Sequence, residues 1–275
     1  MSDRQAARGD SGRLFHKLDG ERLDDLNRGG LMILQKEKGF RFGTDAVLLA
    51  DFAQVKPGDH VADLGAGGGI LSILMADAQS KALFDAVEWQ EAMCDMARRS
   101  VQGNGLEERI IVHHLDVRHA PGVLGYAGHS LVVSNPPYHP KGTAPSSPDP
   151  AHHLARHEGE STVEDFAECA AKILKNGGRA AFIYPAPRVF DLMCAMRAKR
   201  LEPKRIRLIL DRPGAKPKLA LVDAVKGAGS WLDWLPPLIL RGEDGAPTLE
   251  YRRIYRLPLD ENDGKPHNTV GAECQ

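Results

Sequence analysis

The sequence of 275 residues lacks the features of several restricted protein classes. No segment approaches the roughly 20 apolar residues of a membrane-spanning helix, and the polar amino-terminal stretch has no apolar core of a secretory signal. The net charge of −1 removes any global basic signal for nucleic acid. Cysteine is scarce and forms no Cys-x-x-Cys pair, which excludes a disulfide framework and favours a reducing, cytoplasmic location. The four cysteines are Cys94, Cys169, Cys194 and Cys274.

Metal-binding patterns are also missing. The adjacent histidine pairs at 113–114 and 152–153 point to opposite faces of an extended chain. No Cys/His spacing typical of a zinc site is present. We therefore expect no metal.

Short apolar runs alternate with longer segments of helical spacing. The runs cover 60–64, 83–88, 110–113, 131–134 and 180–184, and the helical segments cover 70–77, 90–104, 161–174 and 188–200. This alternation predicts βαβ units and a parallel sheet. Two further runs, 205–210 and 219–225, lie too close together for a crossover helix and favour an antiparallel pair. The expected fold is α/β: a doubly wound, seven-stranded, mostly parallel sheet that ends in an antiparallel hairpin.

The chain is expected to divide into four parts. Residues 1–20 and 259–275 are polar and aperiodic, which predicts flexible tails. Residues 21–56 are expected to form a small cap, with a hairpin of 31–35 and 40–42 followed by a helix over 44–54. Residues 57–258 form the main domain.

A glycine-rich turn joins the first strand of this domain to a helix. In DLGAGGGI, Gly65, Gly67 and Gly69 let the backbone approach a ligand at the helix N-terminus. The dinucleotide fingerprint would need glycine at position 70, where this chain has Ile70. The pattern therefore favours a nucleoside ligand that has no pyrophosphate.

Acidic residues lie near the ends of three neighbouring strands. Asp63 precedes the glycine turn, and Glu88 ends the next strand, where a carboxylate accepts hydrogen bonds from two ribose hydroxyls. Asp116 follows the third strand and either contacts an adenine amino group or caps a helix. Trp89 either packs on the adenine or is buried in the core. S-adenosylmethionine, an adenosine with an amino-acid tail and no phosphate, fits this arrangement as the cofactor.

The stretch SNPPY, residues 134–138, places a rigid polar loop after an apolar run. Two prolines end the strand and fix the backbone, so Asn135 is expected to face the cofactor at the shared strand edge. The Asn135 side-chain oxygen and the Pro136 carbonyl are two acceptors that can hold a planar amino group and aim its lone pair at a methyl group. Tyr138 offers a ring for stacking. The candidate catalytic residues are Asn135, Pro136, Pro137 and Tyr138.

SNPPY after a strand, with DLGAGGG upstream, resembles the NPPY type of class I S-adenosylmethionine-dependent N-methyltransferases, which methylate adenine N6 in nucleic acids or glutamine N5 in release factors. GTDAVLL, residues 43–49, is similar to the bacterial tRNA(Val) adenine-N6 methyltransferases, and this resemblance spans about residues 21–257. It implies that Thr44 and Asp45 line the cofactor pocket. It favours adenine N6 in a tRNA anticodon loop as the target.

Other functions stay open at this level. The main alternative is glutamine-N5 methylation of a release factor, and a further one is N-methylation of another RNA adenine or guanine. A non-catalytic RNA-binding module and a nicotinamide dehydrogenase are less favoured, since the NPPY residues and the cofactor acids are all present. A locally basic stretch favours RNA, although such stretches are often solvated surface. Its members are Arg197, Lys199, Arg200, Lys204, Arg205, Arg207, Arg212, Lys216 and Lys218.

Overall fold

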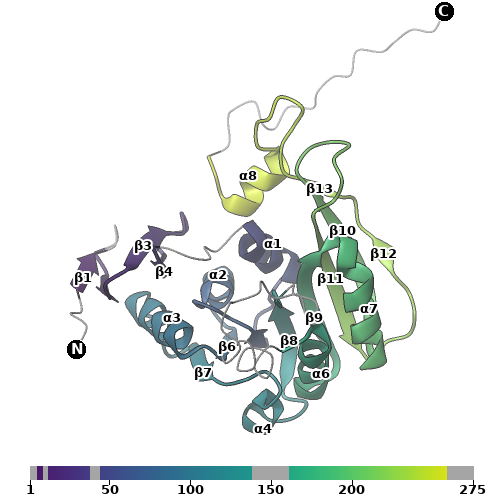
Figure 1. Ribbon diagram of the computed structural model, residues 1–275, viewed down its shortest axis with the longest axis horizontal. Helices are drawn as coiled ribbons and strands as arrows, with labels where there is room; N and C mark the ends of the chain where they lie inside the picture. Colours follow the sequence, from purple (N-terminus) through teal and green to yellow (C-terminus); the bar gives the residue numbers. More distant parts are fainter. Residues whose placement is uncertain (1–4, 9–11, 38–43, 138–160, 259–275) are drawn as a thin grey trace, which may run out of the picture.

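The computed structural model describes residues 5–8, 12–37, 44–137 and 161–258. Its centre is one twisted sheet with helices on both faces (Figure 1). Among the described residues the strand order is β12-β10-β11-β9-β8-β5-β6-β7, with β13 also paired to β10. The neighbours from β9 to β7 are parallel, whereas β11 is antiparallel to both β9 and β10. The expected sheet is therefore confirmed.

Seven of these strands correspond to the predicted apolar runs. They are β5 (His60–Leu64), β6 (Leu83–Glu88), β7 (Ile110–His114), β8 (His129–Ser134), β9 (Leu174–Pro185), β10 (Leu201–Leu210) and β11 (Leu219–Lys226). Two short strands, β12 (Asp233–Trp234) and β13 (Leu238–Ile239), extend the sheet beyond β10. A two-residue strand is too short to leave a periodicity in the sequence.

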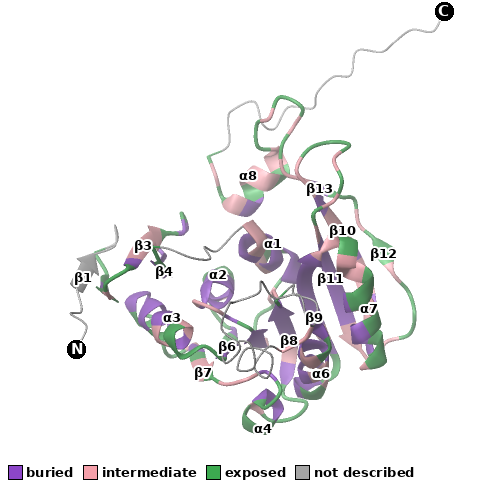
Figure 2. Ribbon diagram, in the orientation of Figure 1, coloured by how far each residue is buried: buried purple, intermediate pink, exposed green. Residues whose placement is uncertain are grey.

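The helices divide between the two faces of the sheet. One face carries α1 (Thr44–Ala53), α2 (Ile70–Ala78) and α3 (Glu91–Gly103), and the other carries α4 (Ala120–Leu124), α6 (Val163–Ile173) and α7 (Val189–Ala198). The short turn η1 (Ala186–Arg188) precedes α7, and α8 (Leu249–Tyr255) packs against α1 and β13. Because both faces are covered, the central strands are buried along most of their length (Figure 2).

The first part of the chain differs from the expected flexible tail over 1–20. Strands β1 (Gln5–Arg8) and β2 (Leu14–Lys17) pair antiparallel, and the Phe15 side chain is fully buried. A Cβ added to Gly103 would lie 2.2 Å from the Phe15 ring, so the glycine in α3 makes room for it. A single buried aromatic residue in a polar stretch carries no periodicity, which explains the missed strand.

The cap also has a different hairpin from the expected one. Strand β4 (Met32–Lys36) matches the predicted run, but its partner is β3 (Glu21–Asp25), upstream in the chain. The partner proposed from the sequence, residues 40–42, lies outside the described residues, as does the tail 259–275. The other domain limits stay predictions. Among the described helices, none is both long enough and apolar enough to cross a bilayer.

Candidate active site

The candidate site lies where the parallel strands β5, β6 and β8 end. Leu64 is in register with Val87 on one side and with Ser134 on the other, so the three strands end level. The Ser134 hydroxyl donates a hydrogen bond to the Leu64 carbonyl oxygen over 2.7 Å. This bond ties the start of the Asn-Pro-Pro loop to the start of the glycine loop. The carboxyl edge of a parallel sheet is the usual ligand site of doubly wound folds.

The glycine loop turns from β5 into α2 through left-handed backbone conformations. Gly65, Gly67 and Gly69 have φ values of 74°, 55° and 83°, which disfavour other residues. An added Cβ would lie 3.2 Å from the Phe166 ring at Gly65 and 3.3 Å from Ala97 at Gly69. At Gly67 the nearest atom would be 3.8 Å away. A side chain would therefore be crowded at Gly65 and Gly69, whereas the space beside Gly67 would accept a Cβ in ordinary contact with Met93.

Glu88 lies at the rim of this loop, as the sequence predicted for a cofactor-binding acid. Its carboxylate accepts hydrogen bonds from the backbone N–H of Gly67 at 2.9 Å and of Gln90 at 2.8 Å, and the residue is buried. A carboxylate has about four lone pairs, so acceptor positions remain for the two hydroxyls of a ribose. The residues present thus fit an adenosine-type cofactor.

Asp63 is bonded to the first turn of α2, and its expected contact with the cofactor stays a prediction. Its buried carboxylate accepts hydrogen bonds from the backbone N–H and the hydroxyl of Ser72, at 3.2 and 2.8 Å. Burial raises the pKa of Asp63 to about 7, against the effect of the Ser72 hydrogen bonds and with a contribution from the nearby Glu88. Asp63 therefore fixes the first turn of α2, and with it the shape of the glycine loop.

Asp116 and Trp89 lie next to the same edge. The Asp116 carboxylate accepts hydrogen bonds from the backbone and guanidinium of Arg118 and from the Ser161 hydroxyl. Burial alone would raise the pKa of Asp116, but the Arg118 hydrogen bonds outweigh it and lower the pKa. These contacts support a turn before α4, and the adenine contact stays a prediction. Trp89 is 54% exposed, so the alternative of burial in the core is wrong.

The catalytic candidates follow directly after β8. Asn135 is partly exposed, Pro136 is buried and Pro137 is exposed. Tyr138 lies outside the described residues. The structure therefore places the first three of these residues beside the glycine loop, and the stacking role of Tyr138 stays a prediction.

Thr44 and Asp45 form the first turn of α1. The other end of this helix is fixed at the amino ends of the strands, since the Arg179 guanidinium donates a hydrogen bond to the Ala53 carbonyl oxygen over 2.7 Å. The first turn must then lie toward the carboxyl ends of the strands, which is the end that carries the glycine loop. A side-chain hydrogen bond joins Thr44 to Tyr255 of α8. The expected cofactor contacts of both residues stay predictions.

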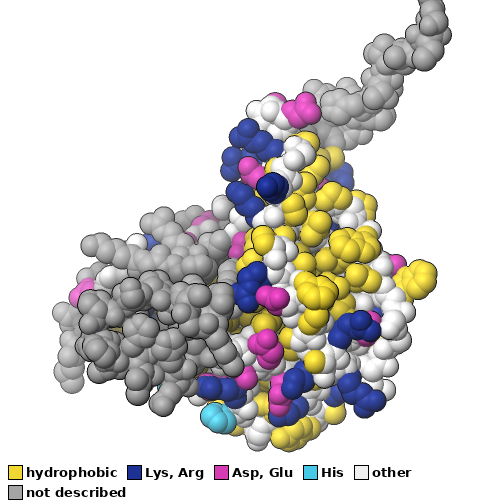
Figure 3. All heavy atoms as spheres, turned by 45° about the vertical axis from the view of Figure 1, so that its right-hand side comes forward, with side chains coloured by type: hydrophobic (Ala, Val, Ile, Leu, Met, Phe, Trp, Pro, Cys, Tyr) yellow, Lys and Arg dark blue, Asp and Glu magenta, His cyan; other side chains and the backbone are white. Residues whose placement is uncertain are grey.

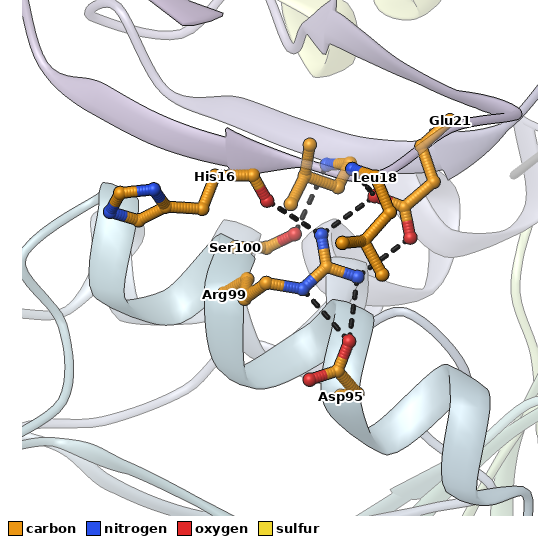
Figure 4. A network of polar contacts seen from close by, with 7 residues as sticks. His16, Leu18, Glu21, Asp95, Arg99 and Ser100 are labelled. Carbon is orange, nitrogen blue, oxygen red and sulfur yellow. Dashed lines mark hydrogen bonds and ion pairs between the residues drawn. The ribbon is translucent and has the colours of Figure 1, made fainter. Parts of the chain in front are cut away.

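The N-terminal unit, defined here as residues 12–36, is fixed on α3 by a polar cluster that the sequence did not predict. Arg99 of α3 makes two 2.6 Å hydrogen bonds to Glu21, one of 2.8 Å to Asp95 and one of 2.7 Å to the His16 carbonyl oxygen (Figure 4). The Arg99 and Glu21 side chains are only 7% and 8% exposed. A buried two-pronged ion pair of this kind holds the unit firmly on α3.

The same helix positions strand β4 against the glycine loop. The Ser100 hydroxyl accepts a hydrogen bond from the Leu34 backbone N–H at 3.0 Å, and the Asn104 amide bonds both backbone groups of Met32. A Cβ added to Gly68 would lie 3.7 Å from the Leu34 carbonyl oxygen. Ser100 and Asn104 are four residues apart and lie on one face at the end of α3, and this polar pair is the only sequence signal for the contact that we identify.

The fold distributes the basic residues of 197–218 between two opposite edges of the sheet. Acidic neighbours are interspersed with Lys and Arg on this face (Figure 3). Five of the basic residues form ion pairs, which reduces their value as phosphate contacts. The pairs are Arg197–Glu202, Lys199–Glu168, Arg205–Asp223, Arg207–Glu250 and the longer Arg212–Asp211.

The loop between β10 and β11 carries the remaining charge near the site. Leu219, which follows this loop, is in register with Pro185 at the carboxyl end of β9, so the loop lies at the edge that carries the glycine loop. Lys216 and Lys218 are exposed, and no ion pair is present for either among the described residues. Arg212 lies 3.9 Å from Asp211. In contrast, Arg200 precedes β10 at the opposite edge.

The sequences of two relatives align with most of this chain. A protein of Tolumonas auensis named tRNA1(Val) (adenine(37)-N6)-methyltransferase is 29% identical over 68% of this chain and 77% of its own length. A protein of the same name from Porphyromonas gingivalis is 28% identical over 78% of this chain and 86% of its own.

The fold is similar to that of a solved structure. The crystal structure of protein Atu636 from Agrobacterium tumefaciens, described as a predicted O-methyltransferase, superimposes with a TM-score of 0.65 at 26% identity and covers 78% of this chain and 96% of its own. The family model described as the methyltransferase small domain matches residues 38–186. This match includes the glycine loop, Glu88 and the Asn-Pro-Pro loop, and it agrees with S-adenosylmethionine as the cofactor. Since it covers more than half of the sequence, the chain belongs to the methyltransferase small domain family.

Proposed function

We propose that this chain transfers a methyl group from S-adenosylmethionine to the N6 amino group of an adenine in tRNA. The observation that carries the proposal is the 2.7 Å bond between Ser134 and Leu64, which holds the Asn-Pro-Pro loop against the cofactor loop. The relatives named tRNA1(Val) (adenine(37)-N6)-methyltransferase support the choice of target. The proposal includes a cytoplasmic location.

The residues of this chain bind and orient the two reactants. Glu88 holds the ribose, and Asp63 maintains the loop that cradles the adenosine. The Asn135 side-chain oxygen and the Pro136 carbonyl accept the two N–H hydrogens of the adenine amino group, which directs its lone pair away from the ring. The cofactor, when bound, supplies an electrophilic methyl group in front of that lone pair. Tyr138 stacks on the adenine, which must leave its own stack at a cost of a few kcal/mol.

Glutamine-N5 methylation of a release factor is the second candidate, because a side-chain amide is also a planar amine that fits two acceptors. The Agrobacterium structure is described as a predicted O-methyltransferase, so a hydroxyl is a third candidate for the group that receives the methyl. A hydroxyl has a single hydrogen and would leave one of the two acceptors without a donor. The names of the relatives favour RNA over both alternatives.

The deciding experiment offers the enzyme two substrates in parallel. Purified tRNA and a recombinant release factor are incubated with methyl-labelled S-adenosylmethionine, and the RNA is digested to nucleosides. Label in N6-methyladenosine supports the proposal. Label in the release factor alone, or in another nucleoside, contradicts it.

We also propose that the β10–β11 loop contacts the tRNA backbone. Lys216→Glu/Lys218→Glu should raise the KM for tRNA. The loss of two phosphate contacts should also reduce the slope of log K against log salt concentration by roughly 1.8. The matched control is Arg200→Glu/Lys204→Glu, at the opposite edge of the sheet. Equal effects of the two double variants would remove the loop from the proposed interface.

A further inference from the structure

Three histidines surround one buried carboxylate of the parallel sheet, and two of them, His60 and His129, are the first residues of their strands. The Asp85 Oδ2 atom of β6 lies 2.7 Å from His60 Nε2 of β5 and 2.9 Å from His129 Nε2 of β8. The other oxygen, Oδ1, lies 2.7 Å from His113 Nε2 of β7. His60 and His129 lie at the end of the sheet opposite to the glycine loop, because His60 and Leu64 are the two ends of β5, about 13 Å apart.

The spacing of three of these atoms suits a small metal ion. The ligand atoms of His60, Asp85 and His129 all lie within 4.8 Å of one another. Ligands at 2.0–2.1 Å from a tetrahedral zinc ion are about 3.3 Å apart. The two nitrogens therefore need to retreat from the carboxylate oxygen by only about half an ångström to admit an ion.

The surroundings resemble those of a site with one open position. The His129 side chain is fully buried and the Asp85 side chain is 9% exposed, whereas the His60 side chain is 44% exposed. Solvent can thus reach the group from the His60 side, where a water can complete the coordination. His113 stays hydrogen-bonded to the second oxygen of Asp85, as an outer partner that orients a ligating carboxylate.

We propose that His60, Asp85 and His129 form a binding site for a divalent transition metal, with zinc as the best match for two imidazoles and one carboxylate. The ion lies between Asp85 and the two imidazoles, which bind it in their neutral form and release any additional proton to solvent, and it links β5, β6 and β8. The Nδ1 atom of His129 is buried and has no hydrogen-bond partner among the described residues. Since an outer partner on a ligating histidine is worth 10–100-fold in affinity, the site binds zinc less tightly than sites with complete outer shells.

The test is a calorimetric titration of the full-length protein with Zn²⁺. All proteins carry Cys194→Ser and Cys274→Ser, which removes the exposed thiol of Cys194 and the thiol of the terminal segment as competing soft ligands. His60→Ala is the main variant because this half-exposed side chain at the first position of β5 can be removed without opening the core. His114→Ala is the matched control, since His114 bonds the Trp89 carbonyl oxygen on another part of the surface.

The expected result is one equivalent of zinc bound to the parent protein and to His114→Ala, with at least a tenfold loss of affinity in His60→Ala. Zinc should raise the melting temperature of the parent and leave methyl transfer unchanged, because the site is remote from the glycine loop. Binding should weaken as the pH falls, since protons compete for the imidazoles. Absence of a one-to-one site, or equal zinc affinity in His60→Ala and the parent protein, would overturn the proposal.

Discussion

Two buried aspartates on neighbouring strands, Asp63 on β5 and Asp85 on β6, are held in opposite ways. Asp63 lies at the carboxyl end of its strand and accepts hydrogen bonds from Ser72 alone, so burial dominates and raises the pKa of Asp63 to about 7. For Asp85, burial also favours the neutral form, but hydrogen bonds from His113 and His129 and the charge of the imidazoles outweigh it and lower the pKa. The same sheet therefore keeps one carboxyl group close to neutral and the other ionised.

The difference shows how the two ends of the sheet are built. At the cofactor end, the donors are mainly backbone N–H groups of a glycine loop and a helix start, whose geometry is set by consecutive residues. Around Asp85, the donors are imidazoles from three different strands. The cofactor end gains a fixed loop geometry from consecutive residues, whereas the Asp85 cluster joins side chains from four neighbouring strands.

The largest effect is expected where a side-chain cluster supports the cofactor end. Arg99→Ala leaves the buried Glu21 carboxylate without its partner, so we expect a loss of about 3–5 kcal/mol in the free energy of unfolding. Cofactor affinity should fall as well, because β4 is held against Gly68 through the same helix. Chemical denaturation and calorimetry measure the two quantities.

Arg98→Ala is the matched control for this variant. Arg98 is the exposed neighbour on α3 and makes a single hydrogen bond to a backbone carbonyl. A double variant Arg99→Met/Glu21→Met should regain much of the stability, because it buries no unpaired charge. If Arg99→Ala were as stable as Arg98→Ala, the N-terminal unit would not depend on this ion pair.

Asn135→Ala tests the cofactor end without changing its carboxylates. Removal of one preorganised hydrogen-bonding group from a reacting centre costs about 10²–10³ in kcat. The affinity for S-adenosylmethionine and the melting temperature should change little, because the glycine loop and Glu88 are intact. Single-turnover methyl transfer separates the two effects. Turnover at the parent rate would contradict the proposed role of Asn135 as a clamp for the amine.

The opposite pKa shifts predict opposite pH dependences of stability. Between pH 4 and 7 the folded protein holds a proton on Asp63 that the unfolded chain has released, so this group lowers stability by about 1.4 kcal/mol for each unit of rising pH. Asp63→Asn should remove that slope. Asp85 is ionised in the folded state, so its contribution is present above its unfolded pKa of about 4 and is lost as the pH falls below it. Asp85→Asn should remove the loss at acid pH and lower stability at neutral pH.

Urea denaturation from pH 3 to 8, in the presence of a chelator, measures both slopes. Glu107→Gln, at an exposed carboxylate in the turn between α3 and β7, serves as the control for an ordinary acidic residue. Parallel profiles for Asp63→Asn and Asp85→Asn would mean that the two ends of the sheet do not differ in the way the hydrogen bonds indicate.

The same contrast explains what could be predicted from the sequence. The position of the glycine loop, Glu88 and the Asn-Pro-Pro loop could be predicted because each is recognised from a few consecutive residues. The strand pattern then placed all three at one edge of the sheet. The Arg99–Glu21 pair and the His60–Asp85–His129 cluster join residues far apart in the chain, so no local spacing reveals them. Asp63 was assigned to the cofactor from its position, and only the structure shows that its carboxylate is turned toward Ser72.

The smallest effect we predict compares two acidic residues of the same strand. Glu88→Ala removes the proposed ribose acceptor and should weaken S-adenosylmethionine binding by about 1.5–3 kcal/mol, the range for a hydrogen bond to a charged group. Asp85→Asn, three residues earlier on β6, should leave that affinity unchanged because its neighbours are the histidines of the opposite end. Glu91→Ala, in the exposed first turn of α3, controls for the loss of a nearby negative charge. Calorimetric affinities that fall equally in Glu88→Ala and Glu91→Ala would assign the effect to charge alone and would leave the ribose without a specific acceptor.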